Sequence, residues 1–358
     1  MVSADRPSRL NLACGVIAVI LVTFLVAVAC SSSSQPPTGS TTKGASATAP
    51  ASDPPSPSPT PTATPLGAAG TFQVGEQDRT FTEPAHTSAG GQYVGQRSLL
   101  TKIRYPLAQG SATRPATGPL PLVVFAPGFQ YCSDTYNDLL SAWASAGYVV
   151  AAVDFPRTDC YAAKSMNESD LVNQPADMSY VLSSLLNISA GPGDPFSGLL
   201  NPNEVAVAGH SDGGDTVAAL AANTCCTDPK HPLKAVAVLS GAVWVPMPGK
   251  YFTQATPPML FVQGSADAIN PPWASVQLYR WDAGTRFYLN LAGADHLQPY
   301  TTANPAEQVV ARTTLAFFDR YVLGQVSEQA TMTQDGNVPG SAELDSGGHV
   351  PHGAGLPA

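Results

Sequence analysis

The chain has 358 residues, of which 44% are hydrophobic and only 12% are charged, and its formal net charge is −9. This composition is typical of an exported globular protein, and it offers no basic surface for binding nucleic acid. An acidic, weakly charged surface also disfavours electrostatic attachment to anionic lipid, so membrane attachment would require a covalent or inserted anchor.

The first thirty residues have the pattern of an export signal. Arg6 and Arg9 precede an apolar run from Leu10 to Ala29, and small residues lead up to Cys30. This pattern resembles a bacterial lipoprotein signal, in which the cysteine is acylated and becomes the first mature residue. We therefore expect residues 1–29 to be a signal peptide and Cys30 to carry a lipid anchor in the cell membrane, facing the cell exterior. An uncleaved membrane-spanning anchor is the alternative, because the apolar run is nearly long enough to cross a bilayer.

A low-complexity segment follows the cysteine. The predicted tether covers residues 30–66, and residues 31–66 consist almost wholly of Ser, Thr, Pro, Ala and Gly. Such a segment cannot bury enough apolar surface to offset the loss of chain entropy on folding. We expect a disordered tether that holds a catalytic domain, residues 67–323, away from the membrane.

The catalytic domain alternates apolar runs with segments of helical periodicity. The predicted strands are 97–106, 120–126, 148–155, the run before Ser211, 233–239, 258–262 and 286–291, and the predicted helices are 135–146, 175–186, the segment after Ser211, and 307–322. This alternation predicts an α/β fold with a mostly parallel central sheet and helices on both of its faces.

Two connections and the tail complete the predicted layout. The connection 241–256 is too short for a helical lid, so no large lid is expected, whereas residues 157–203 leave room for a small cap. The glycine-rich residues 324–358 are predicted to be a disordered tail.

The stretch from Gly209 to Gly213 carries the strongest chemical signal. It places a serine, Ser211, between an apolar run typical of a buried strand and an alanine-rich segment with high helix propensity. Small residues two positions before and after the serine allow the strand and the helix to pass close together. The stretch therefore predicts a sharp strand–turn–helix elbow that presents the serine hydroxyl as a nucleophile, with the backbone N–H of Asp212 facing the same point.

A serine nucleophile requires a base and a carboxylate that orients the base. His296 alone among the six histidines follows the last predicted strand at the edge where Ser211 would lie, whereas His210 adjoins the nucleophile and would point into the sheet. Asp267 ends the preceding strand, at the same edge. Asp295 is the competing carboxylate, but its side chain should point away from that of its neighbour. We predict the catalytic residues Ser211, Asp267 and His296, in the chain order expected for this elbow.

Together with Leu122–Phe129 and Gly293–His296, the elbow resembles the α/β-hydrolase superfamily. The layout is most similar to its compact esterase branch of chlorophyllase-like enzymes, platelet-activating-factor acetylhydrolases and cutinase-type polyesterases, over about residues 70–323. Asp212 departs from the hydrophobic residue often found after the serine in lipases and cutinase-type enzymes. The resemblance implies an oxyanion hole formed by the N–H groups of Phe129 and Asp212.

Aromatic residues near the predicted site are candidates for contacts with the substrate. Phe129, Trp244 and Trp273 could line a groove for the acyl or alcohol group, and ordinary core packing is the alternative for each. The histidines and cysteines lack metal-ligand spacing, so we expect no metal and no cofactor.

Four cysteines follow Cys30, and an even number in an exported protein indicates disulfides. Cys132 and Cys160 each follow a predicted parallel strand by a few residues, and those strands could be neighbours, so we predict that the two cysteines pair. Cys225 and Cys226 could form a bridge between adjacent residues or remain thiols.

These observations predict a lipid-anchored serine esterase that cleaves short-acyl, bulky or polymeric carboxylic esters through an acyl-enzyme. A monomer is expected, with an ester substrate and the membrane as its partners. A serine peptidase of the same fold is the nearest alternative, and a binding lipoprotein that retains an inactive elbow is another.

Overall fold

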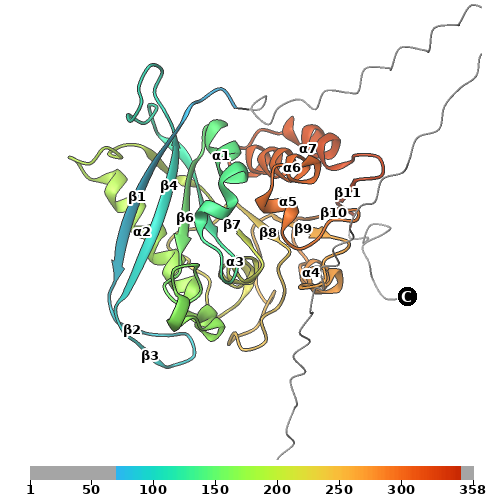
Figure 1. The fold of residues 1–358 in the computed structure, drawn as a ribbon, viewed down its shortest axis with the longest axis horizontal. Helices are drawn as coiled ribbons and strands as arrows, with labels where there is room; N and C mark the ends of the chain where they lie inside the picture. The colour runs from blue at the N-terminus through green and yellow to red at the C-terminus, as the bar shows by residue number, and fades with distance from the viewer. Residues whose placement is uncertain (1–69, 348–358) are drawn as a thin grey trace, which may run out of the picture. The chain divides into compact units, whose positions relative to one another are not determined.

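The computed structural model describes residues 70–347, and a nine-stranded sheet forms their core (Figure 1). The strand order is β1-β4-β6-β5-β7-β8-β9-β10-β11, and the segment from β6 to β10 is parallel throughout. The strands are β1 (Val74–Glu83), β4 (Arg97–Pro106), β5 (Leu120–Ala126), β6 (Val149–Asp154), β7 (Leu200–His210), β8 (Ala235–Leu239), β9 (Met259–Gly264), β10 (Arg286–Leu291) and β11 (Ala342–Asp345). A separate short hairpin pairs β2 (His86–Thr87) with β3 (Tyr93–Val94).

Helices cover both faces of the sheet. One face packs against α2 (Gln174–Ala190), α3 (Asp212–Ala222) and α4 (Pro272–Trp281). The other packs against α1 (Asn137–Ser145), α5 (Gln298–Thr301), α6 (Pro305–Tyr321) and α7 (Glu328–Gly336). Short 3₁₀ turns, η2 (Ser133–Tyr136), η3 (Ala163–Ser165) and η4 (Glu168–Asn173), lie in the connections. This arrangement confirms the fold class predicted from the sequence.

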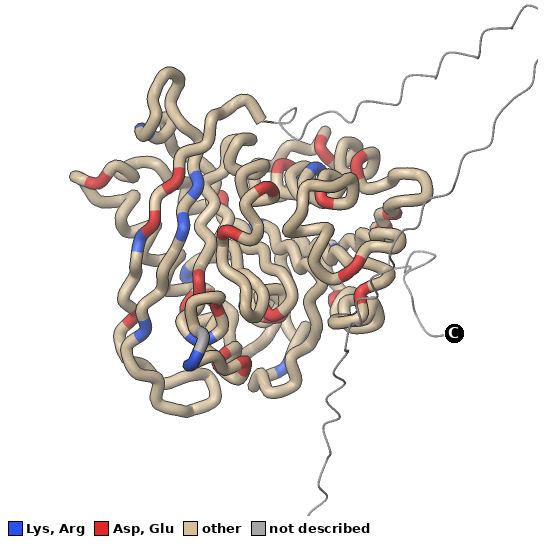
Figure 2. The backbone as a smooth tube through the Cα atoms, viewed as in Figure 1, with Lys and Arg blue, Asp and Glu red and all other residues tan. Residues whose placement is uncertain are grey.

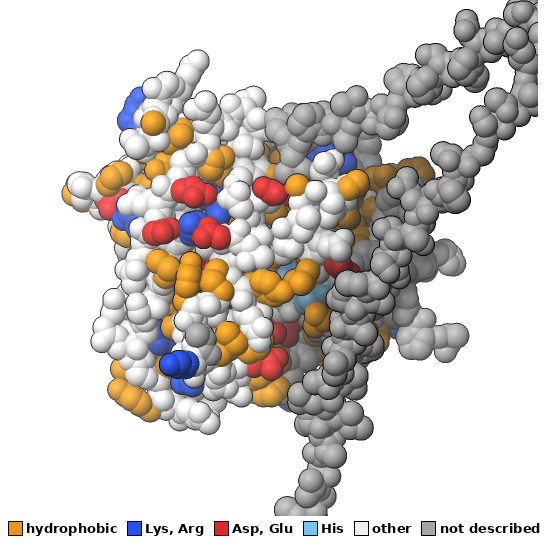
Figure 3. All heavy atoms as spheres, in the orientation of Figure 1, with side chains coloured by type: hydrophobic (Ala, Val, Ile, Leu, Met, Phe, Trp, Pro, Cys, Tyr) orange, Lys and Arg blue, Asp and Glu red, His pale blue; other side chains and the backbone are white. Residues whose placement is uncertain are grey.

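Charged side chains of opposite sign lie together along the antiparallel edge of the sheet. Basic and acidic positions lie side by side along β1 and β4 (Figure 2). Lys102 and Arg104 of β4 form ion pairs with acidic residues, Asp134 among them. On the face seen in Figure 3, acidic and basic side chains are grouped, and hydrophobic side chains form small separate patches. The basic residues at this edge are therefore largely neutralised by their neighbours.

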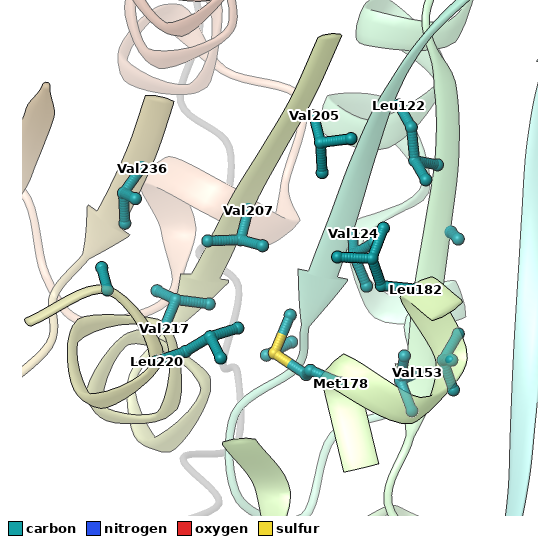
Figure 4. Packing of buried hydrophobic residues seen from close by; sticks show 14 of the residues in the cluster. Leu122, Val124, Val153, Met178, Leu182, Val205, Val207, Val217, Leu220 and Val236 are labelled. Atoms are coloured by element: carbon teal, nitrogen blue, oxygen red, sulfur yellow. The ribbon is translucent and has the colours of Figure 1, made fainter. Parts of the chain in front are cut away.

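The packing beneath α2 and α3 explains why the central strands are apolar along their whole length. Side chains of β5 and β7 point toward the two helices, as Figure 4 shows for Leu122, Val124, Val205, Val207 and their helical partners Met178, Leu182, Val217 and Leu220. Because both faces of each central strand are covered, polar and apolar residues do not alternate along these strands. A strand buried in this way positions the residue at its end rigidly, and at β7 that residue is followed by Ser211.

The prediction of a disordered tail is wrong for the residues that the structure describes beyond Gly324. The helix α7 packs on α6, and β11 pairs antiparallel with β10, with Leu344 opposite Leu289. The tail has few apolar residues, but Met332 of α7 is fully buried in the core. Because the tail is rich in glycine, its overall composition gave no indication of these few buried residues. The remaining tail residues, 348–358, and the predicted signal peptide and tether, residues 1–66, lie outside the described residues.

Replacing Met332 with alanine should lower the free energy of unfolding by about 2–4 kcal/mol, because it removes a buried side chain and leaves a cavity. The exposed neighbour Thr331 provides the control, since Thr331→Ala should change stability by less than about 0.5 kcal/mol. Urea unfolding of both variants measures the difference. Equal stability of the two variants would mean that α7 does not contribute to the core.

Candidate active site

Ser211 lies at the turn between β7 and α3 with its backbone in the left-handed region, at a φ of 56°. Two glycines make this turn possible. A Cβ atom at Gly209 would lie 2.1 Å from the carbonyl oxygen of Gly213, and one at Gly213 would lie 1.9 Å from the carbonyl oxygen of Ala126. Side chains at these positions are therefore excluded, and the serine is held at the carboxyl end of the sheet.

Ser211, His296 and Asp267 form one hydrogen-bonded line. His296 Nε2 lies 2.8 Å from Ser211 Oγ, and His296 Nδ1 lies 2.7 Å from Asp267 Oδ2. With Nδ1–H donating to the carboxylate, Nε2 is left to accept the serine hydroxyl proton. The structure thus brings together the three residues that were predicted from the sequence, and all of them are more than 90% buried.

Asp267 is held by several donors besides His296. Its Oδ1 accepts the N–H groups of Ile269 and Asn270, each at 2.9 Å, and its Oδ2 accepts the Gln263 amide at 2.9 Å. Burial raises the pKa of Asp267, but the hydrogen bond and charge of His296, with these donors, outweigh burial and lower the pKa below its ordinary value. The carboxylate therefore stays ionised at neutral pH. The competitor Asp295 instead accepts the N–H groups of Leu297 and Gln298.

His210 connects the loop after β5 with the loop that carries His296, a role that the sequence reading missed. Its Nε2 lies 2.7 Å from the carbonyl oxygen of His296, and its Nδ1 lies 2.9 Å from the hydroxyl of Tyr136, which accepts the N–H of Gly128 at 3.0 Å. A carbonyl only accepts, so Nε2 carries the proton and Nδ1 accepts from Tyr136. Burial, followed by the charge of His296, lowers the pKa of His210 to about 3. The ring therefore stays neutral at neutral pH, and the hydrogen bonds from Gly128 through Tyr136 and His210 to His296 are retained.

The two predicted oxyanion donors belong to segments next to the nucleophile. Phe129 follows Gly128, where an added Cβ would lie 3.1 Å from Ser211 Cβ. Its loop is fixed by a hydrogen bond from the Gln130 N–H to the carbonyl of Thr158, at 2.7 Å. Asp212 is the first residue of α3, so its N–H has no acceptor within the helix. Both residues thus belong to segments that adjoin Ser211, and their role as oxyanion donors stays a prediction.

The predicted bridge between Cys132 and Cys160 is confirmed, with a Cα–Cα distance of 5.3 Å. It joins the loop after β5 to the loop after β6, and the N–H of Ser133 adds a 2.7 Å hydrogen bond to Asp154. Cys225 and Cys226, whose state the sequence left open, are also bridged in the structure.

The candidate aromatic residues differ in exposure. Trp244 packs with Met247 and Ala219 and is partly buried, Phe129 is half-buried, and Trp273 is 53% exposed. Trp244 thus serves partly as a packing residue. Gly128, which precedes Phe129, lies next to Ser211, and no contact with substrate is assigned to Trp244 or Trp273.

Residues 157–203 form a rim that is fixed to the site, rather than a separate cap. The buried side chain of Gln174 donates to Thr158 Oγ1 at 2.8 Å and accepts from Thr216 Oγ1 of α3 at 2.6 Å. Arg97 of β4 contacts Asp170 and Asp177 within this segment, and all three side chains are buried. Removing one partner from such a network would leave a buried charge uncompensated, so the segment is strongly tied to the sheet.

The chain matches a known protein family over part of its length. The chlorophyllase family model matches residues 102–270, just under half of the chain, from within β4 to the loop after β9. The matched stretch contains Ser211 and Asp267. A search of curated proteins found no match. The family match confirms the resemblance inferred from the elbow.

Tyr136→Phe should lower kcat about tenfold and change KM less than about twofold, because it leaves Gly128 N–H and His210 Nδ1 unpaired beside the reacting groups. Tyr148→Phe is the matched control. Tyr148 is also a buried tyrosine, but its hydroxyl lies 2.7 Å from Asp319 and takes no part in the hydrogen bonds through His210. Steady-state kinetics with thermal unfolding separates catalysis from stability. If both variants retained the wild-type kcat, the hydrogen bonds that connect Gly128 with His296 through Tyr136 and His210 would have no part in positioning the site.

Proposed function

We propose that this chain, an α/β-hydrolase that resembles the chlorophyllase family over residues 102–270, is a serine esterase acting on carboxylic esters. The observation that carries the proposal is the hydrogen-bonded line from Ser211 through His296 to Asp267. The family match supports ester hydrolysis in general, and the geometry supports this particular set of residues. The proposal extends to the acyl-enzyme mechanism and the size of the substrate.

In the proposed reaction, Ser211 Oγ attacks the ester carbonyl carbon while its proton moves to His296 Nε2. The carbonyl oxygen becomes an oxyanion that accepts the N–H groups of Phe129 and Asp212. The intermediate collapses when the C–O bond to the alcohol breaks and His296 returns its proton to the leaving oxygen. Water then attacks the acyl-enzyme with His296 as the base, and the acid is released.

The ionised carboxylate of Asp267 supports this cycle electrostatically. It stabilises the imidazolium that forms when His296 holds the serine proton, and it fixes the tautomer that leaves Nε2 free. Its lowered pKa keeps the negative charge present at each step at neutral pH.

We further propose that the enzyme acts outside the cell as a lipoprotein, attached through Cys30. This rests on the sequence alone, because Cys30 lies outside the described residues. The two disulfides are in keeping with export. In the described part of the chain, no helix combines the length and apolarity needed to cross a membrane. A mature N-terminus that begins with acylated Cys30, measured by mass spectrometry, would support the proposal, whereas a membrane-bound chain that retains residue 1 would contradict it.

Ser211→Ala and His296→Ala should each lower the turnover of p-nitrophenyl esters by at least about a thousandfold while the fold is retained, because the two residues act as a unit. Asp267→Asn should be severely impaired as well, since the ring of His296 loses its charged partner. Asp295→Asn is the matched control and should keep most activity. Full activity of His296→Ala would overturn the assignment, and turnover of peptide substrates but not of esters would favour a peptidase.

Specificity for short acyl chains is also expected, because residues 241–256 contain no helix that could cover the site and the rim is tied to the sheet. In a covered pocket, each buried methylene of the acyl chain contributes about 0.8 kcal/mol to binding, or roughly fourfold in affinity. In an open groove, this contribution ends after the first few carbons, because the rest of the chain stays in water. We expect kcat/KM to peak at about two to six acyl carbons. A series of p-nitrophenyl esters tests this, and a rate that rises steadily to sixteen carbons would contradict it.

A further inference from the structure

The side chain that directly follows the nucleophile is a buried carboxylic acid. Asp212 is only 8% exposed, and its Oδ2 is fully buried without a hydrogen-bond partner. A buried polar atom without a partner costs free energy, so the carboxyl does not stabilise the fold in the state described. Its backbone N–H is the proposed oxyanion donor, but that role does not require a carboxyl side chain.

Two further acidic residues lie in the same region. Asp212 interacts electrostatically with the exposed Glu168 of η4, and both interact with Asp215 of α3. Asp215 is occupied, since its Oδ1 accepts the N–H of Ala242 at 2.5 Å. Burial, followed by the charge of Glu168, raises the pKa of Asp212 to about 7, whereas the charge of His296 acts in the opposite direction. The carboxyl of Asp212 therefore lies within electrostatic range of both the catalytic base and Glu168.

None of the ion pairs among residues 70–347 neutralises this group. The lysines and arginines that form salt bridges there do so with other acidic residues, and Asp212, Asp215 and Glu168 take part in none of those salt bridges. Within the same described range, no cluster of three or more His, Cys, Asp or Glu side chains is arranged to hold a metal ion. Among residues 70–347, the carboxyl beside the nucleophile thus has no salt-bridge partner.

A carboxylate beside the nucleophile has a direct consequence for ester hydrolysis. The transition state develops a negative oxyanion at the Asp212 N–H, and a nearby negative side chain disfavours that charge. A positive charge carried by the substrate would offset both, because it would attract the carboxylate and the oxyanion together. Such a charge acts more strongly in the transition state than in the ground state, which is the condition for raising kcat/KM.

We propose that the Asp212 carboxylate, assisted by Glu168, binds a cationic group of the substrate, so that the preferred esters carry an ammonium group close to the scissile bond. The inference rests on the proposed esterase function and adds the chemical class of its substrate. It predicts that positively charged esters react faster than neutral esters of the same shape, and that negatively charged esters react more slowly.

Two pairs of isosteric esters test the proposal. The acetate esters of choline and of 3,3-dimethylbutanol differ only in a charge on the alcohol side. The p-nitrophenyl esters of 4-trimethylammoniobutanoic acid and 5,5-dimethylhexanoic acid differ only in a charge on the acyl side. In at least one pair, the wild-type enzyme should show a kcat/KM about tenfold higher for the cation at pH 8 and low salt.

Asp212→Asn keeps the backbone N–H and the shape of the side chain, and it should reduce the cationic preference to less than about twofold. Glu168→Gln should reduce it partly, since Glu168 is exposed and its charge is screened. Glu343→Gln, at an exposed position of β11, removes one charge elsewhere and should leave the preference as in the wild type.

The dependence of the preference on pH gives an independent readout. Asp212 with a pKa of about 7 is ionised above that pH, so the ratio of the two kcat/KM values should rise as the pH increases through 7. A pH effect that acts equally on both members of a pair cancels in the ratio, and Glu168 and Asp215 are the other acidic groups that interact electrostatically with Asp212. In Asp212→Asn the ratio should be flat over this range.

The outcomes separate the two proposals. Hydrolysis of the neutral esters without a cationic preference, or a preference that survives in Asp212→Asn, would overturn the inference and leave the esterase intact. Failure of the wild-type enzyme to hydrolyse any of the four esters would overturn the proposed function and the inference with it.

Discussion

The site depends on a close backbone crossing at the end of β7. The carbonyl oxygens of Gly213 and Ala126 occupy the space that side chains at Gly209 and Gly213 would need, so α3, β7 and the end of β5 meet without side chains between them. This crossing holds Ser211 at a positive φ, which is unfavourable for a serine unless the surroundings enforce it. The strain is borne by strands that are buried on both faces and cannot relax.

The same constraint extends to the other members of the site through backbone contacts and buried polar groups. The loops after β9 and β10 contact each other directly: Ser265 N–H donates to the Leu291 carbonyl and Ala266 N–H to the Ala294 carbonyl, each at 2.9 Å. These bonds set the separation of Asp267 and His296. Neutral His210 then ties the His296 backbone to the loop after β5 through Tyr136. Ser211, His296 and the loop that carries Phe129 are therefore positioned by one connected scaffold, which is what preorganised catalysis requires.

Much of this could be predicted because it follows from local patterns. The strand 97–106 alternates in polarity and the strands 120–126 and 286–291 are apolar, and the structure places all three at the predicted bounds. The exposed strand β1 was not predicted because its sequence is mostly polar and its pairing with β4 supplies the order. The helix α4 was missed because two prolines, Pro271 and Pro272, suggest a loop, although proline is favourable in a first turn. The partners of His210 and the burial of Asp212 depend on contacts between distant segments, which no local pattern contains.

Two aspartates of the site illustrate how environment, rather than residue type, determines chemical role. Asp267 receives two backbone N–H groups, a side-chain amide and the imidazole, and its pKa is lowered despite burial. Asp212 is buried to a similar extent, but its Oδ2 has no donor and Glu168 adds repulsion, so its pKa rises to about 7. The first carboxylate is charged across the neutral pH range and orients the base, whereas the second changes its charge near pH 7 and would be stabilised in its charged form by a positive group nearby. Opposite pKa shifts in neighbouring carboxyls are a recurring way of dividing roles within an active site, and here they separate a group that serves every turnover from one that responds to the charge of the substrate.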